Sequence, residues 1–377
     1  MKGFKFFQRN LLLFFTFAFS LGLLSNVFAA SGEKYQTFSV PKECMEQVRK
    51  EGNKLHIYDW AEWWPEEIYE GFSKEFGIDI VRDNFADMDE MFTKFKLHPE
   101  IGYDYTLPEP RVFMQMEKLG VLQKINWDWL PNVRKYLEEK YRDAPLYEQG
   151  YGVPSEANFM GYAYNPKLVD ETDSRIGSWA LVLEGKEYAG KISMMNDMYN
   201  VIGNTLQYLG YSYNSDDEGE LMEAKEVLLR QKLWVMTYDS WPKRLVFEEE
   251  AAIAHMWTGD ALLLKDDLPT LKVVIPKEGT LMVVDSMVIP KGAPHPATAH
   301  LWINYLYRPE VYATLIEAIR YTPCHTKVLE LLPEEIRELP TVKISEEVLE
   351  RCESISSKAF IGKGKELRMK IWEDLKR

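Results

Sequence analysis

The sequence has few of the residues and motifs on which metalloproteins and most hydrolases depend. Its three cysteines, Cys44, Cys324 and Cys352, are too few and too far apart for a disulfide framework or a zinc module, so at most one bridge is expected. The six histidines show no metal-ligand spacing. A nucleophile elbow, a zinc-protease helix, a phosphate-binding loop and a dinucleotide fingerprint are all absent. We therefore expect no metal, no cofactor and no catalytic residue.

The chain also lacks an excess of positive charge. It has 45 Lys and Arg against 59 Asp and Glu, which gives a net charge of −14. Because the nucleic-acid backbone is itself negative, nucleic acid is not expected as a partner. A strongly acidic protein is compatible with a cationic ligand, although net charge cannot locate a site.

The first ten residues contain no acid, and they carry Lys2, Lys5 and Arg9. Residues 11–24 are almost wholly apolar, and small residues follow at Ala29 and Ala30. This order predicts a secretory signal peptide that is cleaved after residue 29, and hence a periplasmic or other extracytoplasmic location. An uncleaved anchor is the alternative, because residues 11–30 approach membrane-spanning length. The lack of a cysteine at the predicted cleavage site argues against a lipid anchor.

Strand and helix patterns alternate from residue 55 onward. After a polar N-terminal extension, residues 30–54, with a short helix at 43–51, we predict a strand at 55–60, a helix at 65–76, a strand at 78–81 and helices at 88–97 and 112–119. A second alternation runs from about 191 to 274, with helices at 201–209 and 220–231, and two amphipathic helices are predicted at 298–307 and 309–319. Residues 362–365 are interpreted as a basic surface turn. Such alternation is typical of an α/β fold with a largely parallel sheet.

Two extended segments, around 151–164 and 283–290, separate these patterns without a flexible linker. We therefore predict two lobes, each a mostly parallel sheet flanked by helices, joined by extended hinge crossings. The first lobe comprises residues 55–157 and 286–325, and the second comprises 158–285 and 326–377. A ligand would bind in the cleft between the lobes.

Aromatic residues make up 13% of the chain, and several adjoin acids in loops predicted to follow strands, where open α/β sheets contact their ligands. Trp60, Glu62 and Trp63 follow the first strand, and Trp257 and Asp260 form a second group. Aromatic faces and carboxylates together suit an alkyl ammonium ion.

Asp197 and Asp285 belong to two further groups of this kind. Each residue also has a simpler interpretation, since a lone Trp can serve packing and Asp197 can cap the helix that follows it. Composition and spacing alone thus predict a two-lobed binding protein with a cation among its candidate ligands.

Seven segments resemble, in order, the periplasmic spermidine/putrescine-binding proteins of bacterial polyamine ABC importers. They are 55–63 (LHIYDWAEW), 151–154 (YGVP), 206–212 (LQYLGYS), 256–260 (MWTGD), 275–279 (IPKEG), 284–290 (VDSMVIP) and 303–309 (INYLYRP). The resemblance implies a polyamine ligand, lobes that close around it and a membrane permease as partner. We expect a monomer. The site residues that it implies are Trp60, Glu62, Trp63, Asp197, Ser240, Trp257, Asp260, Asp285 and Tyr321.

The chain departs from this family at several positions. Arg111 lies where the family usually offers an aromatic ring, and Glu109 replaces a small hydroxyl residue. Val283 replaces a second large aromatic residue, and Asn200 stands where some members have an acid. Either Glu109 neutralises Arg111 and the ligand is a polyamine, or Arg111 binds the carboxylate of a zwitterionic amino acid or ω-amino acid.

An exported hydrolase that uses Glu62 and Asp285 as paired carboxylates is a third hypothesis, which the missing motifs disfavour. The sequence also leaves open whether the membrane partner is an importer or a sensor.

Overall fold

The computed structural model describes residues 35–377 apart from 62 and 86. The predicted signal peptide, residues 1–29, and the candidate site residue Glu62 lie outside the described residues. Residues 39–377 form one compact unit. In the described part of the chain, no helix has the length and apolar character needed to cross a membrane.

The first lobe shows the predicted alternation of strands and helices. β1 lies between β2 and β3 and runs parallel to both. Gly77, with φ 66°, ends α4, and the Asp87 carboxylate caps α5 by accepting a bond from the Glu90 amide (2.7 Å). The elements are α3 (Lys42–Lys50), β1 (Lys54–Trp60), α4 (Glu66–Phe76), β2 (Asp79–Phe85), α5 (Met88–Leu97), β3 (Tyr105–Thr106) and α6 (Pro110–Leu119).

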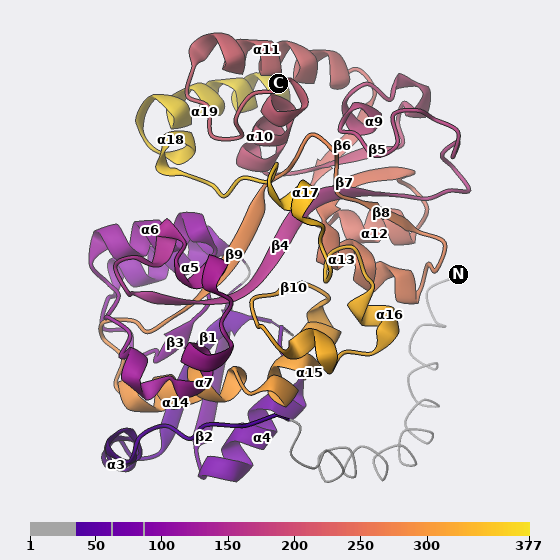
Figure 1. Cartoon of the computed structure of the whole chain (residues 1–377). Helices are drawn as coiled ribbons and strands as arrows, with labels where there is room; N and C mark the ends of the chain where they lie inside the picture. The colour runs from indigo at the N-terminus through magenta and orange to yellow at the C-terminus, as the bar shows by residue number, and fades with distance from the viewer. Residues whose placement is uncertain (1–34, 62, 86) are drawn as a thin grey trace, which may run out of the picture. The chain divides into compact units, whose positions relative to one another are not determined.

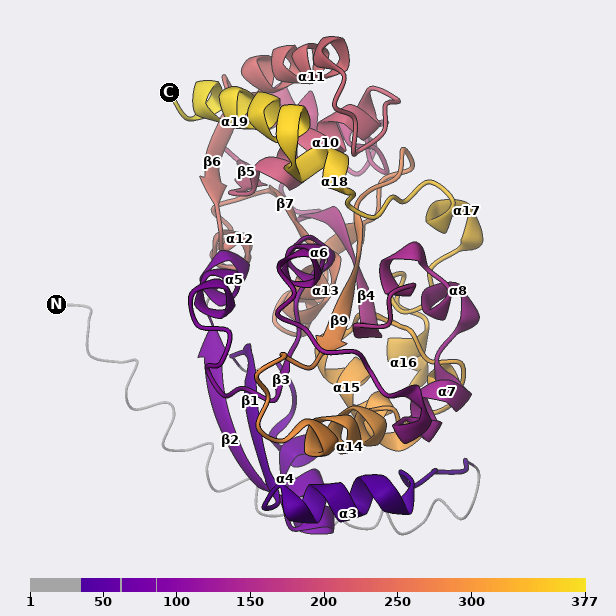
Figure 2. The ribbon, with the colours of Figure 1, turned by 90° about the vertical axis from the view of Figure 1, so that its left-hand side faces the viewer.

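Two buried helices later in the chain return to this lobe. The Glu51 carboxylate accepts bonds from the Ala297 and Thr298 amides, each 3.1 Å, at the start of the first of them. The predicted helix of the N-terminal extension therefore packs on the outside of the first lobe (Figure 2). Short helices occupy the stretch before residue 149, where none was predicted. These elements are η3 (Trp127–Trp129), α7 (Pro131–Tyr136), α8 (Glu139–Arg142), η4 (Pro145–Tyr147), α14 (Pro296–Leu306) and α15 (Pro309–Ile319).

The second lobe repeats the same strand arrangement. β5 lies between β7 and β6 and runs parallel to both. A C-terminal helix, which was not predicted, packs on α10 and α11 (Figure 1). The elements are α9 (Ala180–Leu183), η5 (Lys186–Tyr188), β5 (Ile192–Met195), α10 (Met198–Tyr208), α11 (Glu218–Gln231), β6 (Val235–Asp239), α12 (Pro242–Phe247), β7 (Ile253–Trp257), α13 (Thr258–Leu263), η6 (Leu264–Asp266), β8 (Lys272–Val274), α18 (Ser357–Phe360) and α19 (Gly362–Lys376).

Two long strands connect the lobes, β4 (Gly152–Tyr164) and β9 (Met282–Val288). They pair antiparallel and run side by side between the two groups of helices in both views (Figures 1 and 2). The described strands form one continuous sheet in the order β2-β1-β3-β9-β4-β7-β5-β6, and β8 and β10 (Thr322–Pro323) also pair with β4. All thirteen residues of β4 are buried, as expected for a strand covered on both faces. The predicted extended crossings are therefore present.

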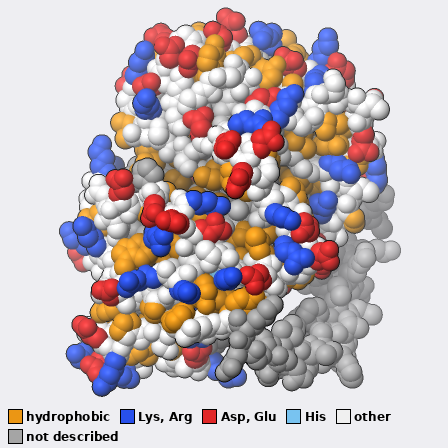
Figure 3. Space-filling model, in the orientation of Figure 1, with side chains coloured by type: hydrophobic (Ala, Val, Ile, Leu, Met, Phe, Trp, Pro, Cys, Tyr) orange, Lys and Arg blue, Asp and Glu red, His pale blue; other side chains and the backbone are white. Residues whose placement is uncertain are grey.

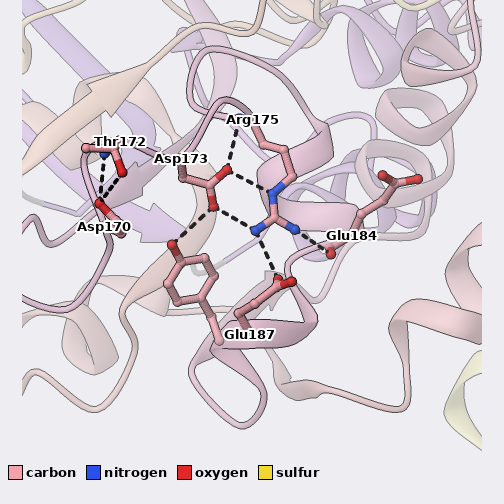
Figure 4. A network of polar contacts seen from close by, with 7 residues as sticks. Asp170, Thr172, Asp173, Arg175, Glu184 and Glu187 are labelled. Carbon is pink, nitrogen blue, oxygen red and sulfur yellow. Dashed lines mark hydrogen bonds and ion pairs between the residues drawn. The ribbon is translucent and has the colours of Figure 1, made fainter.

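A network of polar contacts holds the loop between β4 and α9 (Figure 4). The Arg175 guanidinium donates to both carboxylate oxygens of Asp173 (2.9 and 2.7 Å), to Glu187 (3.0 Å) and to the Glu184 carbonyl (2.8 Å). The bonds from Arg175 lower the pKa of Asp173 to about 2. The remaining short elements, α16 (Glu334–Arg337), α17 (Glu346–Leu349) and η7 (Val328–Glu330), lie in the C-terminal segment.

Candidate functional site

Most of the predicted site residues lie at the carboxyl ends of parallel strands. β1 and β5 each have the next two parallel strands of their lobe on opposite sides. Open α/β sheets bind their ligands beside the carboxyl end of a strand in this position. Trp60 ends β1 and Trp257 ends β7, while Asp197 and Ser240 directly follow β5 and β6. The fold thus brings segments far apart in sequence to equivalent positions in the two lobes.

Aromatic rings lie on the first-lobe side of the candidate site. The Trp60 and Trp63 ring centroids are 6.5 Å apart, and Trp60 also lies 4.6 Å from Phe85 at the end of β2. Trp63 contacts Tyr321 edge to face at 5.4 Å. The Trp63 indole nitrogen is buried without a hydrogen-bond partner among the described residues. The rings therefore form a continuous aromatic wall with one donor still available.

Tyr321 extends this wall to the second lobe. A Cβ atom on Gly259 would overlap the Tyr321 ring, so this close approach requires glycine. Gly259 lies in the first turn of α13, two residues after Trp257. Asp260, which was expected at a turn, lies in this helix, and its carboxylate pairs with Lys243 at 2.9 Å.

Asp197 and Ser240 lie at the second-lobe edge. The Asp197 Oδ1 atom caps α10 by accepting bonds from the Tyr199 and Asn200 amides (2.8 and 3.0 Å), which is the simpler role considered for it. Ser240 is exposed, and its hydroxyl accepts a bond of 3.3 Å from the Asn196 amide group.

Arg111 is held by two carboxylates. It lies in the first turn of α6, which begins at Pro110, two residues earlier than predicted, because proline favours the first helical position. Its guanidinium pairs with Asp89 (3.0 Å) and Glu109 (2.9 Å) and lies 5.7 Å from the Tyr199 ring centroid of the second lobe. Burial raises the pKa of Glu109, and Arg111 partly offsets this. Both prongs of the guanidinium are therefore occupied.

Asp59 on β1 and Asp285 on β9 are buried carboxylates. Asp285 lies in the middle of β9 and is 8% exposed. Burial raises its pKa well above the usual value, and the charges of Glu156, Glu109 and Asp59 raise it further. Asp59 accepts bonds from the Trp60 amide (2.8 Å) and the Trp64 indole (2.9 Å), yet burial still raises its pKa to about 7. Several acidic side chains therefore lie close to the middle of β9.

Glu156 was missed by sequence reasoning. It lies in β4 and is 1% exposed, and burial raises its pKa to about 8, while the Ser155 hydroxyl lowers it and Asp59 raises it. Neither of its carboxylate oxygens has a hydrogen-bond partner in the described part of the chain. In the sequence, the only sign of its importance was that it is the single acidic residue of the predicted extended segment 151–164.

One cavity elsewhere on the described surface lacks these features. A cavity of about 370 Å³ lies between α11 and α19, but its lining contains no aromatic residue, and Lys225 pairs there with Asp374 at 2.6 Å. On the face shown in Figure 3, acidic and basic side chains are interspersed. The described residues contain no group of His, Cys, Asp and Glu arranged to hold a metal ion.

Comparison with known proteins agrees with this architecture. The family described as bacterial extracellular solute-binding protein matches residues 67–344. Spermidine/putrescine-binding periplasmic protein 1 of Haemophilus influenzae is 28% identical over 299 residues, which are 78% of this chain and 82% of that protein. The spermidine/putrescine-binding periplasmic protein of Escherichia coli is 29% identical over 288 residues, covering 76% of this chain and 82% of its own length.

The fold is similar to that of a solved structure. The spermidine/putrescine ABC transporter substrate-binding protein PotD of Streptococcus pneumoniae superposes with a TM-score of 0.79 at 24% identity, over 86% of this chain and 99% of the other. The predicted two-lobed periplasmic-binding-protein fold is therefore confirmed. Since the family match extends over more than half of the sequence, the chain belongs to the bacterial extracellular solute-binding proteins.

Proposed function

We propose that the protein is an extracytoplasmic solute-binding protein of an ABC importer and that it binds a polyamine of the spermidine/putrescine class between its lobes. The observation that carries this proposal is the excess of buried carboxylates beside aromatic rings. Asp59, Glu156 and Asp285 form no ion pair in the described residues, whereas Arg111 is already neutralised. The names of these relatives, which are spermidine/putrescine-binding proteins, support the same ligand class.

The chemistry of an alkyl diamine fits this arrangement. Its methylene groups need flat apolar surfaces, and its ammonium groups need aromatic faces and carboxylates. We assign the surfaces to Trp60, Trp63, Trp257 and Tyr321, and one charge to Asp285. The remaining described residues of the prediction, Asp197, Ser240 and Asp260, would lie at the edges of the site, and Glu62 stays a candidate from the sequence alone.

The lobes that would close on the ligand comprise residues 55–157 with 286–325, and 158–285 with 326–377. Under this division two of the three changes of lobe fall within the paired strands β4 and β9, beside the irregular register between Pro154 and Ala157, and the third follows residue 325. Bending at a hinge there would let the lobes close on the ligand. A membrane permease could then recognise the closed form. We further propose that the chain is exported by cleavage after residue 29, acts as a monomer and performs no catalysis.

The zwitterion hypothesis is less well supported. An anionic ligand group would have to displace Asp89 or Glu109 from Arg111, and it would approach a region that is already negative. The hydrolase hypothesis has no support in the known relatives, which carry the names of binding proteins.

A thermal-shift screen of the chain without residues 1–29 tests the proposal. Putrescine and spermidine should raise Tm, because a ligand at 100 times its Kd stabilises the folded state by about 2.7 kcal/mol. 1,4-Butanediol, which has the length of putrescine without its charges, is the matched control and should give no shift. A shift with 4-aminobutyrate or amino acids, but with no amine, would replace the polyamine by a zwitterion.

A further inference from the structure

Glu156 and Asp285 face one another across the two strands that connect the lobes. In the register of β4 and β9, Pro154 pairs with Ser286 and Ala157 pairs with Val284. Two residues of β4, Ser155 and Glu156, thus lie opposite the single residue Asp285, which is a β-bulge. Counted from the pair Pro154–Ser286 the residue opposite Asp285 is Ser155, and counted from Ala157–Val284 it is Glu156, whose charge raises the pKa of Asp285 more than the charge of any other residue does. Directly opposed side chains in an antiparallel pair share one face of the sheet.

The hydrogen bonds around the bulge hold the backbone and leave the Glu156 carboxylate free. The Tyr307 hydroxyl donates to the Pro154 carbonyl (2.6 Å), and the Tyr312 hydroxyl donates to the Ser155 carbonyl. Tyr147 shares a bond of 2.9 Å with Ser286 across the bulge. These three hydroxyls have other partners. Neither oxygen of Glu156 has a partner at hydrogen-bond geometry in the described chain, and the neighbouring Ser155 hydroxyl offsets only part of the rise in the Glu156 pKa. Buried carboxylates with a purely structural role are normally hydrogen-bonded.

Among the described residues, the charges that act on Glu156 and Asp285 all come from acids. Asp59 approaches from β1 and Asp285 from β9, and Glu109 beside α6 acts on Asp285. The described residues form no salt bridge to Glu156 or Asp285. The other titratable groups around Glu156 are neutral hydroxyls and one thiol, and burial raises the pKa of each of them: Tyr105, Tyr147, Tyr307, Tyr312, Tyr321 and Cys324.

Two opposed buried carboxylates must be neutralised by a proton or by a cation, because a buried ion that lacks a partner is costly. An alkylammonium group supplies up to three N–H donors and one positive charge, so a single group can bridge both carboxylates. The aromatic wall ends beside this pair, since Tyr321 directly precedes β10, which pairs with β4 at Glu156.

We propose that Glu156 and Asp285 together bind one ammonium group of the ligand at the hinge, which makes Glu156 a specificity-determining residue. This inference rests on the proposed function, because it requires an amine ligand. It places one terminal ammonium group on the face of the connecting strands that carries both carboxylates, so the charge that it neutralises lies where the lobes would bend.

Proton release is a consequence that a structural glutamate would not produce. Without ligand, the Glu156 pKa of about 8 keeps the carboxyl group protonated at pH 6.5. An ammonium group favours the ionised form, so binding at pH 6.5 expels a proton to solvent. The affinity for putrescine should therefore rise as the pH increases from about 5.5 towards 8, while putrescine itself stays protonated.

Titration calorimetry with putrescine tests the proposal on the chain without residues 1–29. Glu156→Gln should weaken binding about 10- to 100-fold, as expected for a lost hydrogen bond to a charged group. Measurements at pH 6.5 in two buffers of different ionisation enthalpy should show proton release by the wild type and less by the variant. Glu278→Gln is the matched control, because Glu278 binds Ser178 and Trp179 within the second lobe, so this change should lower Tm without altering Kd.

Glu156→Leu separates a binding role from a structural one. Replacing a carboxylate that has no partner by an apolar group of similar size should raise the Tm of the ligand-free protein while it weakens putrescine binding. Unchanged affinity in both variants would overturn the inference and leave the polyamine function intact. If neither variant folds, the absence of proton release by the wild type overturns it. If the wild type binds no amine, the proposed function and this inference fall together.

Discussion

Asp285 combines low exposure, a raised pKa and nearby negative charge, so a ligand cation would relieve an unfavourable arrangement. Asp285→Asn should weaken putrescine binding by about 1.5–3 kcal/mol, the range for hydrogen bonds to charged groups. Without ligand, the same change should not destabilise the fold, because it removes one of several like charges. Calorimetry and thermal melts measure the two effects, and wild-type affinity in the variant would exclude Asp285 from the site.

The close approach of Gly259 to Tyr321 leads to a second prediction at the level of a single residue. Gly259→Ala places a methyl group against the tyrosine ring, so it should lower stability by about 1–3 kcal/mol and also weaken the ligand by displacing the aromatic wall. Gly219→Ala in α11 is the control, because its Cβ would approach only the Asp217 carboxylate, at 3.1 Å. Equal urea midpoints for the two variants would contradict the prediction.

The sequence alone indicated that the aromatic and acidic residues after β1 and β7 are candidates for the binding site, because aromatic rings beside acids at strand ends suit a cationic ligand. It could not reveal that Lys243 pairs with Asp260, or that two carboxylates hold Arg111 from both sides. Glu156 was missed because only the pairing of β4 with β9 places it opposite Asp285. Contacts between distant segments decide the role of each of these residues.

At the level of elements, the polar network of the β4–α9 loop should contribute measurably to the free energy of unfolding (Figure 4). Arg175 makes bonds to Asp173, Glu187 and the Glu184 carbonyl from a side chain that is 23% exposed. Arg175→Ala should lower the free energy of unfolding by about 1–2 kcal/mol, more than an exposed pair contributes. Urea denaturation measures this, with Arg142→Ala as the control, because Arg142 makes surface pairs only and should change stability by less than about 0.5 kcal/mol.

The pH dependence of this loop has a defined sign. Because the folded-state pKa of Asp173 is lowered to about 2 from a usual value of 3.8, its stabilisation is present above pH 4 and is lost as the pH falls towards 2. Arg175→Ala should therefore flatten the acid limb of the stability profile. An acid limb identical to that of the wild type would show that the network does not act through this carboxylate.

Periodicity predicted most of the longer helices and strands, because each buries one face or lies in the sheet, but it did not predict α19, which has fifteen residues. The helices α5 and α15 occupy the predicted residues, and the bounds of β1 and α11 differ by one or two. Short helices between 127 and 147 were not predicted, because packing rather than sequence pattern holds them. The start of α19 was interpreted as a basic turn, yet Gly364 is buried there against Lys358.

For the whole molecule, the buried acids predict an unusual dependence of stability on pH. In the unfolded chain Asp59, Glu156 and Asp285 ionise near pH 4, whereas in the folded chain the pKa of Asp59 is about 7, that of Glu156 is about 8 and that of Asp285 is raised well above its usual value. The folded state therefore binds more protons than the unfolded state between about pH 4.5 and 8. Its stability without ligand should fall as the pH rises through this range.

A polyamine should oppose this loss, because its positive charges replace the protons that the carboxylates give up. We expect the ligand-free protein to unfold at a lower urea concentration at pH 8 than at pH 5.5, and saturating putrescine to stabilise it more at pH 8. The variant with both Glu156→Gln and Asp285→Asn should lose most of the difference between the two pH values. A pH-independent urea midpoint in the ligand-free wild type would mean that the buried carboxylates are neutralised within the protein itself, which would leave no electrostatic reason to bind a cation there.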